Sequence, residues 1–276
     1  MTYHIKHLLK YPKYQTFLTN LISKSGARYV LTVNEIHDIL LKNQDKRDSF
    51  IYDIFRKYMI NTISNKTDVD YTRSRMRKAT IRYNEIMKIS NIGDMQDFQR
   101  YLDFGAGDCS MAVLLGKCFG IDQIYAVDIK GWEGVLTDPG IYRKQCKFKE
   151  YDGLNIPYKD DSFDLITSFQ VLHHIDDIIW ILAELHRILC KGGIFIIREH
   201  NCHNSKMRRL IEIEHELHDK VFNSEINHNE AYSCYRTKKL LKRLITDIGF
   251  KYIGQHCMDD SVWNPTRYYY QAFQKV

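Results

Sequence analysis

The sequence has 276 residues, of which 44% are hydrophobic and 27% are charged, so it is long enough for one α/β domain with an extension or for two small domains. It contains no run of about 18 apolar residues, which argues against a membrane-spanning helix, and its seven cysteines lack the even number and spacing of a disulfide framework, which favours a reducing compartment. The net charge of +6 is uneven, because residues 1–90 contain 17 lysines and arginines against 8 aspartates and glutamates, and such an excess is suggestive of a polyanionic partner.

Helices are predicted near the N-terminus, because apolar side chains recur there at three- and four-residue intervals. They run from His4 to Ile22 and from Val33 to Ile60. Residues 64–70 are polar and predict a connection, after which a further helix is expected from Tyr71 to Ser90. We therefore expect residues 1–98 to form a basic, α-helical N-terminal extension.

The helix from Tyr71 contains a dense set of basic side chains. These side chains are Arg73, Arg75, Arg77, Lys78 and Arg82, and at helical spacing Arg75, Lys78 and Arg82 share one face. The apolar side chains of the same helix are expected to point elsewhere: Met76, Ile81 and Ile86. A basic face of this kind is suited to the phosphates of RNA, and it is equally typical of a solvated helix surface.

Residues 100–198 alternate between short apolar runs and helical patterns, which predicts a parallel sheet with helices on both faces. Helices are expected from Ser110 and over Asp176–Leu189. The predicted strands are Tyr101–Phe104, Gln123–Val127, Lys147–Glu150, Asp164–Ser168 and Ile194–Arg198. After a polar stretch come two more helices and two more strands: Lys206–Phe222, Thr237–Ile248, Tyr252–His256 and Arg267–Phe273.

A glycine turn follows the first predicted strand, at Gly105-Ala106-Gly107. Glycine allows a positive φ and lets a ligand approach the backbone closely, and the helix that follows offers free N–H groups. The pattern therefore predicts a nucleotide-like ligand at a βα turn. A dinucleotide is less well supported, because Ser110 stands where the third fingerprint glycine would be.

Further polar residues follow the next strands, and ligands of such sheets bind beyond the carboxyl ends of the strands. Asp128 and Ile129 lie at the end of the second strand, about 20 residues past the glycines, where a carboxylate is placed to accept the hydroxyls of a ribose. Asp152 and Gly153 follow the third strand and would suit an adenine edge. The fourth strand leads into a loop that ends in His173 and His174.

Four successive motifs resemble those of class I S-adenosylmethionine-dependent methyltransferases, in particular the broad group that includes the ubiquinone/menaquinone-biosynthesis enzymes. They read LDFGAGDCS, AVDI, YDGLNIPYKDDSFDLITSFQVLHHI and ILAELHRILCKGG, and they cover roughly residues 99–198. The resemblance implies a seven-stranded, mostly parallel Rossmann-like sheet whose last strand is antiparallel, with residues 99–276 as the methyltransferase domain and a cap-like insertion at about 199–236. Cys109 departs from the family, since many members have glycine there.

The resemblance also implies roles for individual residues. S-adenosyl-L-methionine would be the cofactor, with its amino-acid end at Asp103 and the glycine turn, its ribose diol at Asp128 and its adenine at Asp152. Gln170 and His173 would lie near the sulfonium. The expected cofactor-binding residues are Asp103, Phe104, Gly105, Ala106, Gly107, Asp128, Ile129, Asp152, Gly153, Gln170 and His173.

The methyl acceptor should be bound by the region after the fifth strand, where the stretches REHNC and AYSCYR resemble methyltransferases of some large viruses. The candidates for a general base are His174, Glu199 and His200. A zinc site is a further alternative, but the spacing lacks the paired ligands of zinc modules, so no metal is expected. Its candidate ligands are His200, Cys202, His203, His215, His218 and Cys234.

Three classes of function remain open from the sequence. The first is an RNA methyltransferase, with the region near a cap as one candidate target, which we favour because of the basic residues Arg73, Arg75, Lys78 and Arg82. The second is a small-molecule methyltransferase with the N-terminal helices as a lid. The third is a non-catalytic partner, which the intact acidic residues at three strand ends argue against. We expect no membrane partner and a cytoplasmic protein, in the host cytoplasm if it is viral.

Overall fold

The computed structural model describes residues 5–24, 31–63, 68–89, 92, 97–129, 140–217, 234–258 and 266–276. Its sheet contains β1 (Arg100–Phe104), β2 (Gln123–Ile129), β3 (Lys147–Tyr151), β4 (Phe163–Phe169), β5 (Leu189–His200), β6 (Phe250–Cys257) and β7 (Tyr268–Lys275). The order of these strands in the sheet is β3-β2-β1-β4-β5-β7-β6. All pairings among β1 to β5 are parallel, whereas β7 is antiparallel to both of its neighbours. The seven-stranded fold with an antiparallel last strand is therefore confirmed.

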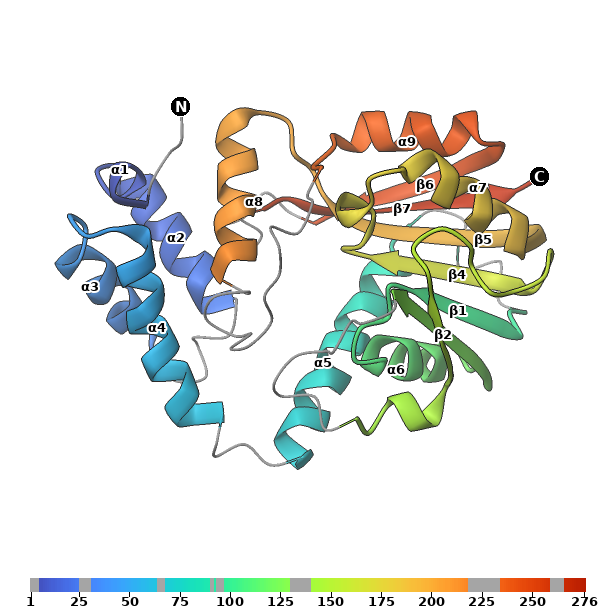
Figure 1. Ribbon diagram of the computed structural model, residues 1–276, viewed down its shortest axis with the longest axis horizontal. Coiled ribbons are helices and arrows are strands. Elements are labelled where there is room, and N and C mark those ends of the chain that lie inside the picture. Colours follow the sequence, from blue (N-terminus) through green and yellow to red (C-terminus); the bar gives the residue numbers. More distant parts are fainter. Residues whose placement is uncertain are drawn as a thin grey trace.

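Helices cover both faces of the sheet (Figure 1). On one face α6 (Ser110–Cys118) and α5 (Asp68–Ile86) lie beside each other and share a core with the sheet that includes Ala79, Ala112 and Leu165. On the other face α7 (Ile178–Ile188) and α9 (Lys238–Asp247) bury their apolar sides. Because β1 to β5 are parallel, their carboxyl ends meet at one edge, which brings the predicted strand-end residues together.

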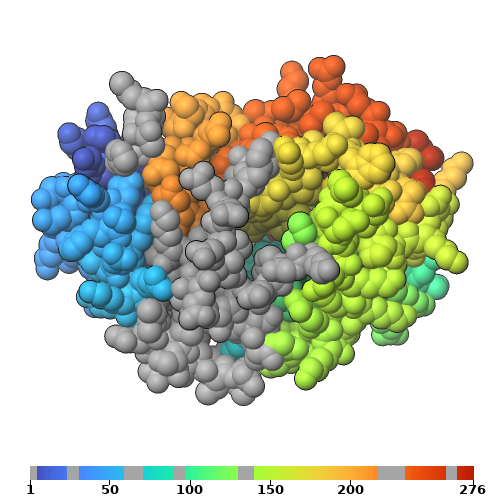
Figure 2. Space-filling view, viewed as in Figure 1, coloured from blue at the N-terminus to red at the C-terminus, as the bar shows by residue number. Residues whose placement is uncertain are grey.

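The N-terminal helices pack on an element from the distant part of the chain. They are α1 (Ile5–Leu8), α2 (Pro12–Lys24), α3 (Val33–Lys42) and α4 (Asp48–Ile63), and their core includes side chains of α8 (Ser205–Leu217). The Tyr52 hydroxyl donates to Glu216 at 2.5 Å, and Arg209 pairs with Asp48 at 3.3 Å. Figures 1 and 2 show α8 between this helical layer and the sheet domain.

Each long helix predicted near the N-terminus is divided in two. The first is interrupted before Pro12, whose ring cannot continue a preceding helical turn. The second ends at Lys42, where Asn43 caps the helix with backbone bonds to Leu40 and Leu41, and it resumes at Asp48. Periodicity alone does not reveal these turns, because the apolar spacing continues across them. Within the described residues, none of the helices has the length and apolar character needed to cross a bilayer.

Candidate functional site

The turn after β1 has the geometry that its glycines predict. Gly105 has φ +74° and Gly107 has φ +54°. A Cβ at Gly105 would lie 2.2 Å from a methyl group of Val171, so no larger residue fits there without movement. The Gly105 N–H donates to the carbonyl of Val127 at 2.9 Å, which ties the turn to the end of β2. Phe104 and Ala106 are buried on either side of Gly105.

Asp128 joins this turn to the next strand. Its carboxylate is buried and accepts the N–H of Gly107 at 2.6 Å and that of Ile129 at 2.7 Å. Asp103 is also buried, and it accepts the hydroxyl of Thr167 at 2.6 Å. Burial raises the pKa of Asp128, and burial raises the pKa of Asp103 to about 7. The site thus contains two carboxyl groups whose charged forms are disfavoured by burial.

Asp152 differs from these two acids because it is exposed. It accepts the N–H groups of Leu154 at 2.8 Å and Asn155 at 2.7 Å, and these hydrogen bonds lower its pKa. Gly153 has φ +91°, and its Cβ position faces the side chain of Ile129 at 3.6 Å. The ends of β2 and β3 therefore adjoin at the edge of the site, with Asp152 holding the conformation of its own turn.

Helix α5 directs part of its basic face toward this site. Arg75 pairs with Asp108 at 2.5 Å, and the hydroxyl of Tyr71 donates to the same carboxylate at 2.6 Å. Arg82 lies over the ring of Phe169 at 5.4 Å, and burial lowers its pKa to about 10. Lys78 is exposed.

The apolar residues expected to point away from the basic face differ in burial. Ile86 is fully buried, whereas Met76 and Ile81 are 43% and 45% exposed. Arg75 and Arg82 do share a face, but that face is turned toward the β1 turn and β4. The reason is that α5 packs its small and aromatic residues on α6. The spacing of the charged residues along the sequence does not show which face of the helix is buried in this way.

Gln170 lies in a polar chain beyond β4. Its backbone has φ +63°, its side-chain oxygen accepts from Arg198 at 2.5 Å, and its amide donates to the hydroxyl of Tyr268 at 2.9 Å. Tyr268 donates in turn to Glu214 of α8 at 2.8 Å. This chain connects the end of β4 to α8 through β5 and β7.

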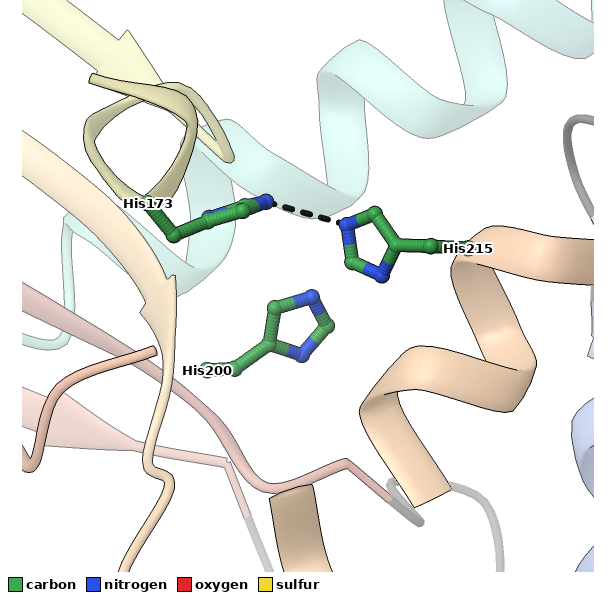
Figure 3. Close-up of side chains that lie close together, drawn as sticks. All are labelled: His173, His200 and His215. Atoms are coloured by element: carbon green, nitrogen blue, oxygen red, sulfur yellow. Dashed lines mark hydrogen bonds between the residues drawn. The ribbon is translucent and has the colours of Figure 1, made fainter. Parts of the chain in front are cut away.

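Three histidines converge beside this chain (Figure 3). His173 lies in a single 3₁₀ turn after β4, His200 is the last residue of β5, and His215 lies on α8. Nε2 of His173 is 3.0 Å from Nε2 of His215. The ring centroid of Tyr235 lies 5.4 Å from the ring centroid of His173 and 5.4 Å from that of His215. A small recess at this place is lined by His173, Glu199, His200 and Tyr235 together with neighbouring side chains.

The general-base candidates occupy different environments. Glu199 is buried, accepts the backbone N–H groups of Val171 and Leu172, and contacts Nδ1 of His173 at 2.6 Å, so its contacts fit the positioning of His173. His200 is buried, whereas His174 is exposed beside His173.

Of the residues weighed for zinc, the structure brings His200 and His215 together, and His218 lies outside the described residues. Sequence reasoning missed the meeting of His173 with His215 and the inward direction of Arg82. Both depend on how α8 and α5 pack, and no local pattern marks them.

A family model described as a methyltransferase domain matches residues 70–255. Norajmaline N-methyltransferase of Rauvolfia serpentina is 28% identical over 120 residues, 41% of each chain. Demethylmenaquinone methyltransferase of Bacillus mycoides is 25% identical over 162 residues, 56% of this chain and 64% of the relative. The chain thus spans about two fifths to two thirds of the length of these curated relatives.

Solved structures agree with the fold. A chain described as a methyltransferase, in complex with the Haloferax volcanii Trm112 methyltransferase activator, aligns with a TM-score of 0.51 at 15% identity, over 73% of this chain and 94% of that one. A SAM-dependent methyltransferase of Thermotoga maritima aligns with a TM-score of 0.50 at 19% identity, over 76% of this chain and 96% of that one. At these identities the likeness shows the architecture alone.

Proposed function

The chain belongs to the methyltransferase domain family, and from that premise we propose that it transfers a methyl group from S-adenosylmethionine to an acceptor bound beside the three histidines. The observation that carries the proposal is the meeting of the Gly105 turn, Asp103 and Asp128 at one sheet edge. Both acids are buried there, and a cationic, ribose-containing ligand matches their chemistry.

Each residue of the site would contact a different part of the cofactor. Asp128 and Asp152 would hold the ribose and adenine, and Asp103 with the Gly105 turn would hold the amino-acid end. Gln170, fixed between Arg198 and Tyr268, would border the sulfonium. The cofactor supplies an activated methyl group with a good leaving group, so the protein mainly has to align the acceptor for in-line attack.

We propose that the acceptor is a small molecule. The region beyond β4 and β5 is a small recess with buried His173, Glu199 and His200, which is suited to a compact polar group. Arg75 and Arg82, two of the four basic residues expected from the sequence to contact RNA, contact Asp108 and Phe169 instead. Two relatives are named as methyltransferases of norajmaline and demethylmenaquinone, which are small molecules.

RNA is the second candidate acceptor, and one observation favours it. Arg73, Arg77 and Lys78 are exposed on α5, in the basic N-terminal third of the chain. Exposed cations on a helix next to the cofactor site are suited to steering a polyanion. A cytoplasmic location would fit either acceptor and stays a prediction.

Cofactor binding tests the proposal. S-adenosylmethionine at about 100 times its dissociation constant should stabilise the fold by about 2.7 kcal/mol and raise the melting temperature accordingly. Asp128→Ala should remove most of that rise, and Asp122→Ala, at an exposed position before β2, should keep it. The quantity compared is the rise within each variant, so a general loss of stability does not affect it. If millimolar S-adenosylmethionine does not raise the melting temperature of the wild type, the proposal is refuted. If it does, a labelled-methyl transfer screen of metabolites and RNA identifies the class of acceptor.

A further inference from the structure

The ring nitrogens of His173, His200 and His215 form a compact group of possible metal ligands. One ring nitrogen from each of the three lies within 4.8 Å of the others. The side chains come from three separate elements, the 3₁₀ turn after β4, the end of β5 and α8 (Figure 3). His173 and His200 are buried, and His215 is half-buried. Three imidazoles of this kind are a common donor set for zinc and other divalent transition metals.

The outer nitrogens of two of these rings are fixed by acceptors. Nδ1 of His215 is 2.8 Å from the backbone carbonyl of Ile211, which can only accept, so this nitrogen carries a proton. Nδ1 of His173 is 2.6 Å from Oε2 of Glu199, whose other oxygen accepts two backbone N–H groups. A carboxylate held in this way accepts from His173, so its Nδ1 also carries the proton. In its neutral form each of these rings therefore presents Nε2 as a lone pair.

The two Nε2 atoms face each other at 3.0 Å. Two lone pairs at this distance repel, and the arrangement becomes favourable only when a cation lies between them, either a shared proton or a metal ion. Zinc–nitrogen bonds of about 2.0–2.1 Å place the ligands of a tetrahedral site roughly 3.3 Å apart. The observed separation is close to that value.

The surroundings favour the metal over the proton. The arrangement Glu199–His173 is the carboxylate–histidine pair that typically orients a metal ligand and raises its basicity. A second carboxylate, Glu214, lies behind the third ring, with Oε2 3.9 Å from Nδ1 of His200. A single shared proton would need only one pair of rings, whereas here a third imidazole, with a carboxylate behind it, joins the other two.

We propose that His173, His200 and His215 bind one divalent transition-metal ion, with Zn²⁺ as the best match to three imidazoles. This departs from the expectation of no metal, which rested on ligand spacing in the sequence. Glu199 is the positioning residue, because it fixes the tautomer of His173. Three protein ligands leave a fourth position for water or another donor. If the proposed methyl transfer holds, that position would take the nucleophilic oxygen or nitrogen of the acceptor and lower its pKa.

Metal titration of the full chain tests the proposal. The chelator-treated protein is titrated with Co²⁺ and Zn²⁺ and followed by visible absorption and calorimetry. We expect one ion per chain and a tetrahedral Co²⁺ spectrum without a sulfur charge-transfer band. His215→Gln and His200→Gln should each weaken binding on the order of 100-fold, and Glu199→Gln by about 10- to 100-fold. His203→Gln, an exposed histidine near the end of β5, is the matched control and should bind as the wild type does.

Several results would overturn the proposal. They are an absence of stoichiometric binding by the folded wild type, equal binding by His215→Gln, or a sulfur band that places the ion on cysteine. Circular dichroism identifies any variant that fails to fold, and X-ray absorption of the wild-type Zn²⁺ protein counts the imidazole ligands without any variant. S-adenosylmethionine binding is measured separately, so a failed methyltransferase proposal and a failed metal proposal give different results.

Discussion

At the scale of single residues, the site depends on carboxyl groups placed where charge is costly. Asp103 is buried next to Thr167, and burial raises its pKa from an ordinary value of 3.8 to about 7. Arg82 is the nearby positive charge that partly offsets this effect. A buried carboxyl group of this kind favours a cationic ligand, because a bound ammonium would stabilise the negative charge of the ionised carboxylate.

The raised pKa of Asp103 predicts a pH-dependent stability. The folded state binds this proton more tightly than the unfolded state, so the contribution is present at low pH and is lost as the pH rises toward 7. Between about pH 5 and pH 8 the loss should be on the order of 2–3 kcal/mol. Asp103→Asn keeps an acceptor for Thr167 but does not titrate, so its free energy of unfolding should fall less over this range. Urea unfolding at pH 5 and pH 8 measures the change in the free energy of unfolding for each protein, with Asp122→Asn as the control. An equal change in the wild type and in Asp103→Asn would contradict the prediction.

Residues at the strand ends could be predicted from the sequence, whereas the histidine cluster could not. The positions of Gly105 and Asp128 follow from local rules, since a strand, a glycine turn and the next strand end determine where those side chains lie. His173 and His215 are 42 residues apart and meet only because α8 packs beside the end of β5. No spacing rule applies to ligands contributed by a strand end, a loop and a separate helix.

At the scale of elements, α5 is the part of the N-terminal region most closely joined to the cofactor site. Its Arg75 and Tyr71 both contact Asp108 in the turn that starts α6. The other N-terminal helices pack on α8, the helix that carries His215 of the histidine cluster. The basic pattern of α5 was visible in the sequence, but its direction depends on packing against α6, which the sequence does not specify locally.

The contact between α5 and Asp108 predicts a stability cost. Arg75→Ala leaves a mostly buried carboxylate without its cation, so we expect a loss of about 2 kcal/mol in the free energy of unfolding. Arg77→Ala, two residues away at an exposed position, should change it by less than about 0.5 kcal/mol. Chemical denaturation measures both values. Equal effects of the two substitutions would show that the ion pair contributes nothing to the fold.

At the scale of the whole molecule, the charge distribution and the recess favour different acceptors. The basic excess lies in residues 1–90, yet Arg75 and Arg82 of the basic face of α5 are engaged in contacts within the protein. The parts of the N-terminal region nearest to the histidines are α5 and the layer that packs on α8. The recess itself is small and lined by buried side chains such as His173 and Glu199, which suits a compact acceptor.

The small-molecule proposal therefore predicts weak RNA binding that does not depend on α5. Arg73→Ala with Lys78→Ala removes two exposed charges beside the cofactor site, and Lys239→Ala with Arg243→Ala removes two exposed charges on α9. We expect both double variants to bind single-stranded RNA with the same small loss of affinity, as non-specific attraction requires. If RNA is the acceptor instead, only the α5 variant should lower the slope of log affinity against log salt, by roughly 0.7 for each lost phosphate contact. Binding measured by fluorescence anisotropy at several salt concentrations separates the two outcomes, and a selective effect of the α5 pair would replace the small molecule with RNA as the acceptor.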